Sequence, residues 1–455
     1  MKPFLKFIWV LLSGIAVWGT QRGFSATLTL EQIFASALEN NQQLKAATAA
    51  LEQARALKKE AGRRLFPTIS LNANVTQSEH PGYQSLPPAL TGGSQMSFFP
   101  ERLYKFSFDV DQPIYRGGRI WSALRRRELQ QAKAEWDQKG VKQKVFAEIL
   151  QTAWKWSAQN EKWKVLKESK DRQKEFVRLT RRRLRAGNAR EYELLQGEAD
   201  LISYGPRMSE VEESQITLKE SLVVLAGLQP RDTFPESFFF LSDKTPRAEL
   251  KGHFLEVSRQ NNPELRSAQL ATELAVVNKA IQLGEHYPSV SVRGSYGWST
   301  PERSEIGSGE AQTSTLSLVL NVPLFSGLTS VQLRRAGQMG IRVAEAGYRS
   351  SLDRQRVRIA GGRLALVASG NRLTQSRQWH QKTKKALHEV IESYEVGLTS
   401  NLQVVQLQAS RERAALAEIG ARLDYHQKFL DWKLALGQSI EEWAKGLAGT
   451  HRKGP

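Results

Sequence analysis

Cysteine is absent from this sequence of 455 residues, and its absence removes several classes of protein. A chain without thiols has no disulfide framework, no thiolate metal site and no cysteine nucleophile. It also carries no lipid on an N-terminal cysteine. Long hydrophobic runs are scarce too, because nothing after residue 26 approaches the ~18 consecutive apolar residues of a spanning helix. A role inside a membrane would therefore have to come from strands.

Catalytic and metal-binding signatures are also missing. The sequence contains no H-E-x-x-H, no G-x-x-x-x-G-K-[ST] and no G-x-S-x-G motif. His380 and His388 lie eight positions apart in a helical pattern, where exposure is commoner than metal ligation. We therefore expect no catalytic residue, no cofactor and no metal site in this chain.

Acidic residues are too few to balance the basic ones, and the net charge is +19. A surplus of this size leaves open a secreted helical scaffold that binds polyanions or nucleic acid. That alternative does not explain the alternating strands described below, so nucleic acid is not the expected partner. The basic runs are 125–127, 334–335 and 178–185, each of which is either a solvated helix face or a site for lipid, murein or a protein partner.

The N-terminus has the pattern of a secretory signal. Lys2 and Lys6 precede the apolar run "FIWVLLSGIAVWG" at Phe7–Gly19, which has the length of a signal-peptide core. The sequence thus predicts a signal peptide at 1–26, with cleavage after Ala26.

The rest of the sequence contains two similar copies of one pattern of motifs. "ENNQQLKAA" at Glu39–Ala47 matches "QNNPELRSA" at Gln260–Ala268, and "QPIYRGG" matches "VPLFSGL" 210 positions later. A repeat of this length indicates a tandem duplication of one structural unit. We expect a first repeat at 27–247, a second at 248–437 and a C-terminal segment at 438–455.

Each repeat contains two segments with the period-two alternation of strands. In the fourth of these segments, Leu316, Leu318 and Leu320 alternate with polar residues. Strands of about ten residues are long enough to cross a bilayer when tilted. A soluble sandwich with one wet face is the other interpretation. The predicted strands are 67–79, 103–114, 288–299 and 313–325.

The remaining segments have helical patterns with matching lengths. At 1.5 Å per residue, two of the predicted helices span about 100 Å and the others about 55 Å. In the last one the apolar residues follow three- and four-residue steps, which Glu412 and His426 interrupt, as in helices packed side by side. The predicted helices are 29–65, 118–186, 190–226, 250–285, 328–396 and 400–436.

Four strands cannot close a barrel, and open edges leave backbone groups unpaired in hydrocarbon. Copies of the chain must therefore complete the wall. Two copies give eight strands, whose interior side chains fill, whereas three give twelve strands and a lumen. We expect a homotrimer in contact with outer-membrane lipid. Pro113 and Pro323 are expected to end strands, and Gly117 and Gly327 to let the chain turn into the long helices.

In these motifs the chain resembles the TolC family of outer-membrane channel proteins. The resemblance rests on "LTLEQIFASALENNQQL", "NNPEL", the paired "FP" and "YP" strand openings, both proline–glycine junctions and "SYEVGLTSNLQVVQLQASR". It implies an α+β membrane protein whose trimer forms a twelve-stranded barrel in the cell outer membrane and a helical periplasmic tunnel. It implies the function of an efflux or type I secretion channel, docked by a periplasmic adaptor to an RND or ABC inner-membrane transporter. An equatorial collar would form from 228–252 and the segment after Gly437.

The resemblance also implies a gate at the helix tips, 185–196 and 395–406, with turns at Gly187 and Gly397. Well-known members have aspartates in the inner ring and an arginine at a link position. Gln403, Gln406 and Thr399 stand there in this sequence, so cation binding at the constriction is in doubt. A hydrogen bond between Glu193 and Tyr394 could still hold the closed state. The positions carried over to the gate are Glu193, Gln196, Tyr394, Thr399, Gln403 and Gln406.

Overall fold

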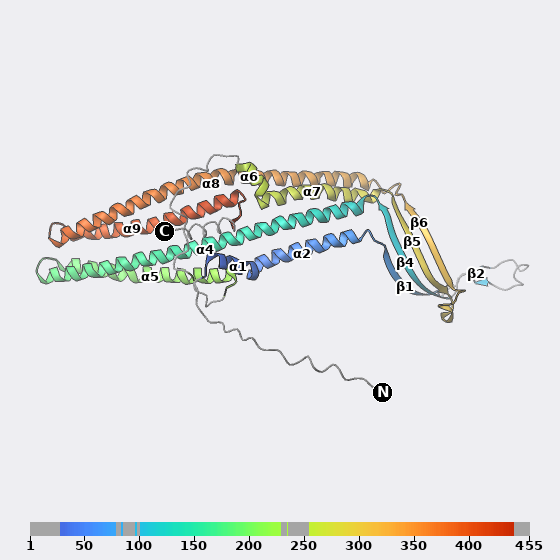
Figure 1. Cartoon of the computed structure of the whole chain (residues 1–455), viewed down its shortest axis with the longest axis horizontal. Coiled ribbons are helices and arrows are strands. Elements are labelled where there is room, and N and C mark those ends of the chain that lie inside the picture. The colour runs from blue at the N-terminus through green and yellow to red at the C-terminus, as the bar shows by residue number, and fades with distance from the viewer. Residues whose placement is uncertain are drawn as a thin grey trace, which may run out of the picture.

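The computed structural model describes residues 28–78, 83–84, 96–97, 101–228, 234 and 254–440. The expected signal peptide and most of the expected collar segments lie outside this range. Figure 1 shows a rod of long helices with a sheet at one end. The helices are α1 (Leu30–Asn40), α2 (Gln42–Arg63), α4 (Arg119–Arg185), α5 (Glu191–Ala226), α6 (Phe254–Asn261), α7 (Pro263–Leu283), α8 (Thr329–Glu395) and α9 (Asn401–Ala435).

The strands form one antiparallel sheet in the order β1-β4-β5-β6, which confirms the four predicted strands. In the described part of the chain, β1 and β6 each pair on one side only, so both are free edges. A separate pair of two-residue strands, β2 (Tyr83–Gln84) and β3 (Met96–Ser97), lies beyond the end of the sheet. The sheet strands are β1 (Thr68–Gln77), β4 (Arg102–Arg116), β5 (Ser289–Thr300) and β6 (Gln312–Asn321).

The two faces of this sheet differ in polarity because the strands are in matching register. One row across the four strands is polar and consists of Ser70, Asp109, Ser295 and Thr315. The next row points to the opposite face and consists of Ile69, Val110, Gly294 and Leu316. The apolar face is open, with 73% of Ile69 and 80% of Leu316 exposed. A face this apolar needs a cover that the described part of the chain does not provide.

Pro113 does not end its strand, contrary to the expectation. β4 continues to Arg116, and its register with β5 shifts between Pro113 and Tyr115. A bulge of this kind accommodates a residue that lacks an N–H group. Pro323, in contrast, follows the end of β6 at Asn321.

Both strand-to-helix junctions contain residues with positive φ, but the two copies have diverged. Gly117 and Gly118 have φ of 58° and 74° in the first copy. In the second copy Gly327 has φ of 63°, and Leu328 takes the place of Gly118 with φ of 60°. A leucine in the left-handed region is strained, because its Cβ crowds the backbone.

The helix lengths confirm the predicted pattern, since α4 and α8 have 67 residues each, or about 100 Å. Two predicted helices are broken, however. The segment 29–65 divides into α1 and α2 at Asn41, and 250–285 divides into α6 and α7 at Asn262. The repeated "NN" motif therefore marks an interruption in both copies.

Asparagine breaks the helix because its side chain competes with the backbone for the same N–H groups. The Oδ1 atom of Asn41 accepts hydrogen bonds from the N–H groups of Gln43 and Leu44, at 2.9 and 3.1 Å. Asn262 caps α7 in the same way. The amide of Asn41 also donates to the carbonyl of Leu225 at the end of α5, at 2.8 Å, and so joins the helix break to a second helix.

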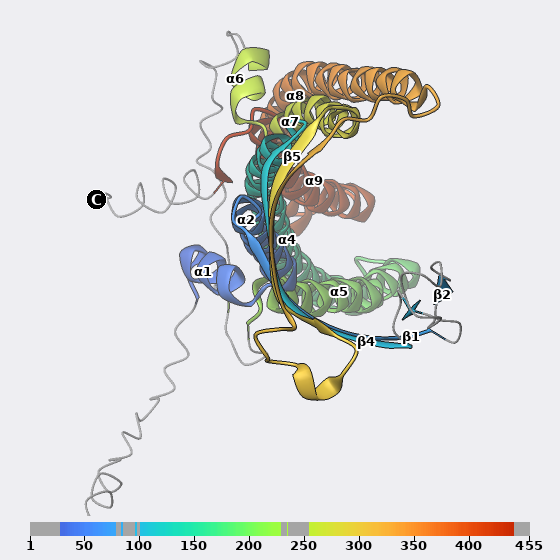
Figure 2. The same ribbon diagram turned by 90° about the vertical axis from the view of Figure 1, so that its right-hand side faces the viewer.

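Side by side, α2, α4, α7 and α8 form the half of the rod near the sheet, and the α4–α5 and α8–α9 hairpins form the other half. In an end-on view these helices follow an arc (Figure 2). The short helices α1 and α6 lie on the outside of that arc. No helix among the described residues is both long and apolar enough to cross a membrane.

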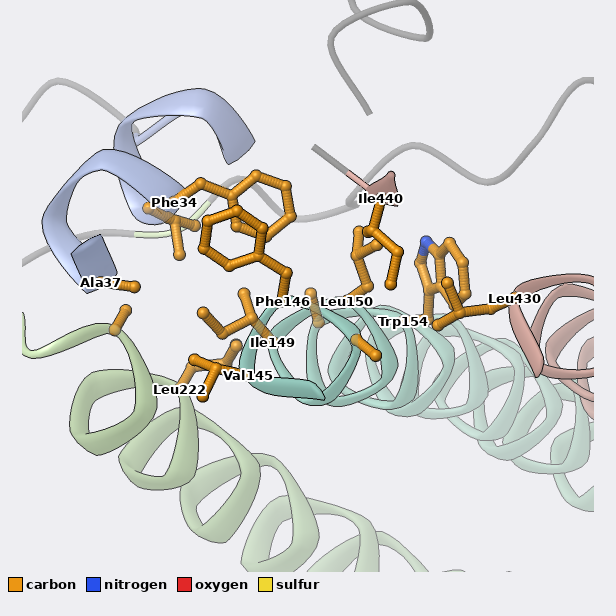
Figure 3. Packing of buried hydrophobic residues seen from close by; sticks show 14 of the residues in the cluster. Phe34, Ala37, Val145, Phe146, Ile149, Leu150, Trp154, Leu222, Leu430 and Ile440 are labelled. Atoms are coloured by element: carbon orange, nitrogen blue, oxygen red, sulfur yellow. The ribbon is translucent and has the colours of Figure 1, made fainter. Parts of the chain in front are cut away.

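The main hydrophobic core lies at the middle of the rod, where α1, α4, α5 and the end of α9 meet (Figure 3). Phe34 of α1 stacks on Phe146 of α4, with ring centroids 4.4 Å apart. Trp154 and Leu430 extend the cluster towards α9. This core holds the two hairpins together at the level where α5 and α9 take the place of α2 and α7 beside the long helices.

We predict that Asn41→Ala lowers the thermal unfolding midpoint of the purified protein, whereas Gln42→Ala leaves it nearly unchanged. The substitution removes a helix cap and the bond to Leu225, with an expected loss of about 1–2 kcal/mol. Thermal unfolding followed by circular dichroism in detergent measures the shift. Equal midpoints for the two variants would contradict the capping role.

Candidate functional site at the helix tips

The two hairpin turns at the end of the rod far from the sheet have the same backbone geometry. Gly187 ends the α4 side with φ of 76°, and Gly397 ends the α8 side with φ of 81°. The N–H of Asn188 bonds the carbonyl of Arg183 at 2.8 Å, and the N–H of Leu398 bonds that of Ser393 at 2.9 Å. This is the hydrogen bonding with which a left-handed glycine closes a helix.

Tyr394 connects the two hairpins just above the turns. Only 3% of it is exposed, and its ring lies 5.5 Å from the ring of Phe176 on α4. The guanidinium of Arg183 lies 4.4 Å from the centre of the Tyr394 ring. The same group donates to the carbonyl of Tyr394 at 2.7 Å. Since α8 has no basic residue in its last turn, Arg183 supplies a cation to that helix end from the neighbouring helix.

The expected hydrogen bond between Glu193 and Tyr394 is not formed, so that expectation is wrong for this conformation. The Tyr394 hydroxyl is buried and has no hydrogen-bond partner among the described residues. Glu193 instead accepts from the Nδ2 atom of Asn401 at 3.3 Å. The sequence analysis missed Asn401, although its place at the first turn of α9, across from the start of α5, offered a signal.

The remaining predicted gate residues are polar and accessible. Gln403 and Gln406 are exposed on the first two turns of α9, and Gln196 is exposed on α5. Thr399 donates its hydroxyl to the amide oxygen of Gln403. The structure thus gathers these side chains at one end of the rod as a neutral, hydrogen-bonding surface.

A second connection between the hairpins lies about 18 Å above the turn, twelve residues along α9 from its cap. Glu412 is only 5% exposed and accepts from the Tyr204 hydroxyl of α5 at 2.7 Å. It also forms an ion pair with Arg207 of α5. We call Glu412, Tyr204 and Arg207 the Glu412 clamp.

Burial raises the pKa of Tyr204 far above its usual range, and the bond to Glu412 acts in the same direction. The hydroxyl therefore stays protonated at any physiological pH and serves as a donor. The clamp is absent from the other copy of the motif, because Ile202 stands at the position matching Glu412. Its only sequence signal is the charge that interrupts the apolar steps of α9.

Weaker polar contacts continue between α9 and α4 above the clamp. Arg422 pairs with Glu161 at 3.0 Å, and Gln151 lies 3.5 Å from Asp431. In the described part of the chain, no three His, Asp or Glu side chains gather as metal ligands.

The family model described as "Outer membrane efflux protein" matches residues 33–228 and 254–438. The chain is 22% identical to the probable efflux pump outer membrane protein TtgC of Pseudomonas putida, over 91% of this chain and 84% of that protein. Its fold is similar to the Campylobacter jejuni outer membrane channel CmeC, with a TM-score of 0.76, 19% identity and coverage of 93% and 90%.

The outer membrane channel MtrE of Neisseria gonorrhoeae is similar in fold to the same degree, with a TM-score of 0.76 and 19% identity over 90% and 89% of the two chains. These matches confirm the predicted fold class, the cell outer membrane as the location and the resemblance drawn from the motifs. The chain belongs to the outer membrane efflux protein family.

Proposed function

We propose that this chain is the outer-membrane channel and periplasmic tunnel of a tripartite efflux pump or a type I secretion system. The observation that carries the proposal is a four-stranded sheet with free edges and an exposed apolar face, continuous with helices about 100 Å long. Such a sheet provides part of a membrane wall, and the helices extend the passage into the periplasm. The channel conducts passively, and its partners supply the energy.

The free edges of β1 and β6 support a homotrimer. In hydrocarbon each unpaired edge group costs several kcal/mol, so β1 of one copy must pair with β6 of the next. Three copies supply twelve strands, enough for a lumen, and cyclic symmetry closes the ring. The polar face then lines the water-filled bore, where Arg293 pairs with Asp111 at 3.3 Å. The apolar face meets the lipid.

The partners follow from the family. TtgC is described as an efflux pump component, and a passive outer-membrane conduit requires an energised transporter in the inner membrane. We place a periplasmic adaptor at the helix tips and an RND or ABC transporter beyond it. The gate is formed by Tyr394, Thr399, Gln403, Gln406, Glu193 and Gln196.

The Glu412 clamp sets the point about which the gate opens. Below it, the hairpins are joined by the partly buried Asn401–Glu193 hydrogen bond and by the contacts of Tyr394. Separating the buried Glu412 carboxylate from both of its partners, one of them in an ion pair, costs more than breaking the single hydrogen bond at the tip. Opening therefore spreads the tip below Glu412 while the wall above it stays closed.

The experiment that tests the proposed function is single-channel recording of the purified protein in planar bilayers. We expect detergent-stable trimers that give discrete conductance steps, because three sheets close one pore. A compact monomer that needs no detergent, or a correctly assembled trimer without conductance, would exclude the channel.

We predict that Glu412→Ala raises the open probability of the isolated channel, because it removes the Glu412 clamp that holds the two hairpins together. Tyr204→Phe should have a smaller effect, since it removes one hydrogen bond and keeps the ion pair. Glu389→Gln, an exposed carboxylate on α8, is the control. Lower thermal stability of Glu412→Ala with wild-type conductance would show that the clamp has no part in gating.

We predict that Gln403→Asp combined with Gln406→Asp shifts the channel towards cation selectivity. Two carboxylates per subunit place six negative charges around the constriction of a trimer, which attracts cations and repels anions. Reversal potentials in a salt gradient measure the change, and Gln381→Asp higher on α8 is the control. An unchanged reversal potential would place these residues outside the conducting path.

A further inference from the structure

The two hairpin tips have opposite charge at matching positions. Residues 182–193 contain four arginines and two glutamates, whereas the matching residues 392–403 contain two glutamates and no basic residue. Glu392 stands at the position matching Arg182, and Glu395 at the position matching Arg185. The backbone geometry of the turns is the same, so the difference lies in the charge alone.

These charges are accessible. Arg182 and Arg185 are exposed on α4, and among the residues that the structure describes neither has an ion-pair partner. Glu395 and Glu392 are exposed on α8, and the Glu392 carboxylate pairs with the exposed His388 at 3.3 Å. Each pair is three residues apart on a helix and so faces one direction. Each tip therefore presents two like charges on one surface.

The glutamates stand where helix stability disfavours them. The C-terminal end of a helix carries a partial negative charge, so each acidic residue in the last turn lowers the stability of the helix by about 0.3–1 kcal/mol. Glu392 and Glu395 occupy the last turn of α8, which contains no basic residue. The arginines at the end of α4 suit their helix, whereas the glutamates at the end of α8 do not. Arg183 reaches the Tyr394 carbonyl at this helix end, but among the described residues it forms no ion pair with Glu392 or Glu395. Both carboxylates therefore remain available to a ligand outside the chain.

We propose that the tips form a charge-coded docking surface for the periplasmic adaptor, in which the α4–α5 tip takes an acidic loop and the α8–α9 tip takes a basic one. This inference rests on the proposed function and specifies its partner. In a trimer the six tips alternate in charge around the ring. A uniformly anionic membrane surface would be attracted to one tip and repelled by the next, so the alternation favours a protein.

The alternating charge has a consequence for assembly. Complementary charges steer encounter and fix register, and like charges placed opposite each other reject wrong arrangements. An adaptor ring whose loops alternate between acidic and basic meets like charges at every contact when it is rotated by one hairpin position. Because the two kinds of tip share one backbone geometry, shape alone would allow the adaptor to dock in two rotational positions. The alternating charge selects one of them.

The test uses two synthetic helical hairpin peptides of the same sequence, one with glutamates and one with lysines at its loop. Binding of each to the full channel in detergent is measured at low and moderate salt. Arg182→Glu with Arg185→Glu should weaken the acidic hairpin about tenfold, and Glu392→Arg with Glu395→Arg should weaken the basic hairpin about tenfold. Both affinities should fall with added salt.

Lys170→Glu with Lys174→Glu on α4 is the matched control, because it makes the same change of charge above the tip. Effects no larger than this control would overturn the proposal. A second result would also overturn it: the wild-type channel binds phosphatidylglycerol vesicles more strongly than the acidic hairpin, and Arg182→Glu with Arg185→Glu abolishes the vesicle binding. The ligand of this tip would then be a membrane.

Conductance of the isolated channel separates docking from contacts between tips. We expect the effects of the two charge reversals on conductance to add when all four substitutions are combined, because docking does not require the tips to pair with each other. If each charge-reversal variant has a higher conductance than wild type, and the variant with all four substitutions does not, then neighbouring tips pair with each other. That result would overturn the proposal. Wild-type conductance with no hairpin binding rejects only the docking code, whereas absent conductance rejects the channel itself.

Discussion

The constraint on which this structure depends is that hydrocarbon offers no hydrogen bond to an unpaired strand edge. The sheet of β1, β4, β5 and β6 satisfies its interior groups but leaves one edge open at each end. In the proposed channel, assembly is therefore a condition of insertion into the membrane. The proposed assembly also accounts for the alternation of the strands, because each residue would face either lipid or water, with no dry core between.

The helical part of the structure is under a different constraint. As the proposed periplasmic tunnel, it must stay closed along its length and open at one end. The core around Phe34, Phe146 and Trp154 holds the hairpins together at mid-length. Between this core and the tip, the buried Glu412 joins the hairpins through Tyr204 and Arg207, and the cluster of Phe176, Tyr394 and Val404 joins them again near the turns. The described contacts between the hairpins thus include charged groups towards the tip, where the proposed gate lies.

The sequence predicted features that depend on period and length: the four strands, the two helices of about 100 Å and the duplication. It did not predict features that depend on a single side chain. The breaks at Asn41 and Asn262 occur because an amide competes locally for backbone N–H groups inside a helical pattern. The bulge after Pro113 and the Asn401–Glu193 bond depend on which chain segments meet in space. The periodicity of a single segment therefore does not predict them.

Arg183 shows how far the two copies have become dependent on each other. It belongs to α4 of the first repeat, yet its guanidinium binds the end of α8 in the second, where no basic residue is present. The helix of the second half is therefore completed by the first. Two copies of the second half would have Ser393 at the position of Arg183, and two copies of the first half would have Leu184 at the position of Tyr394. Either symmetric protein would therefore lose part of this contact.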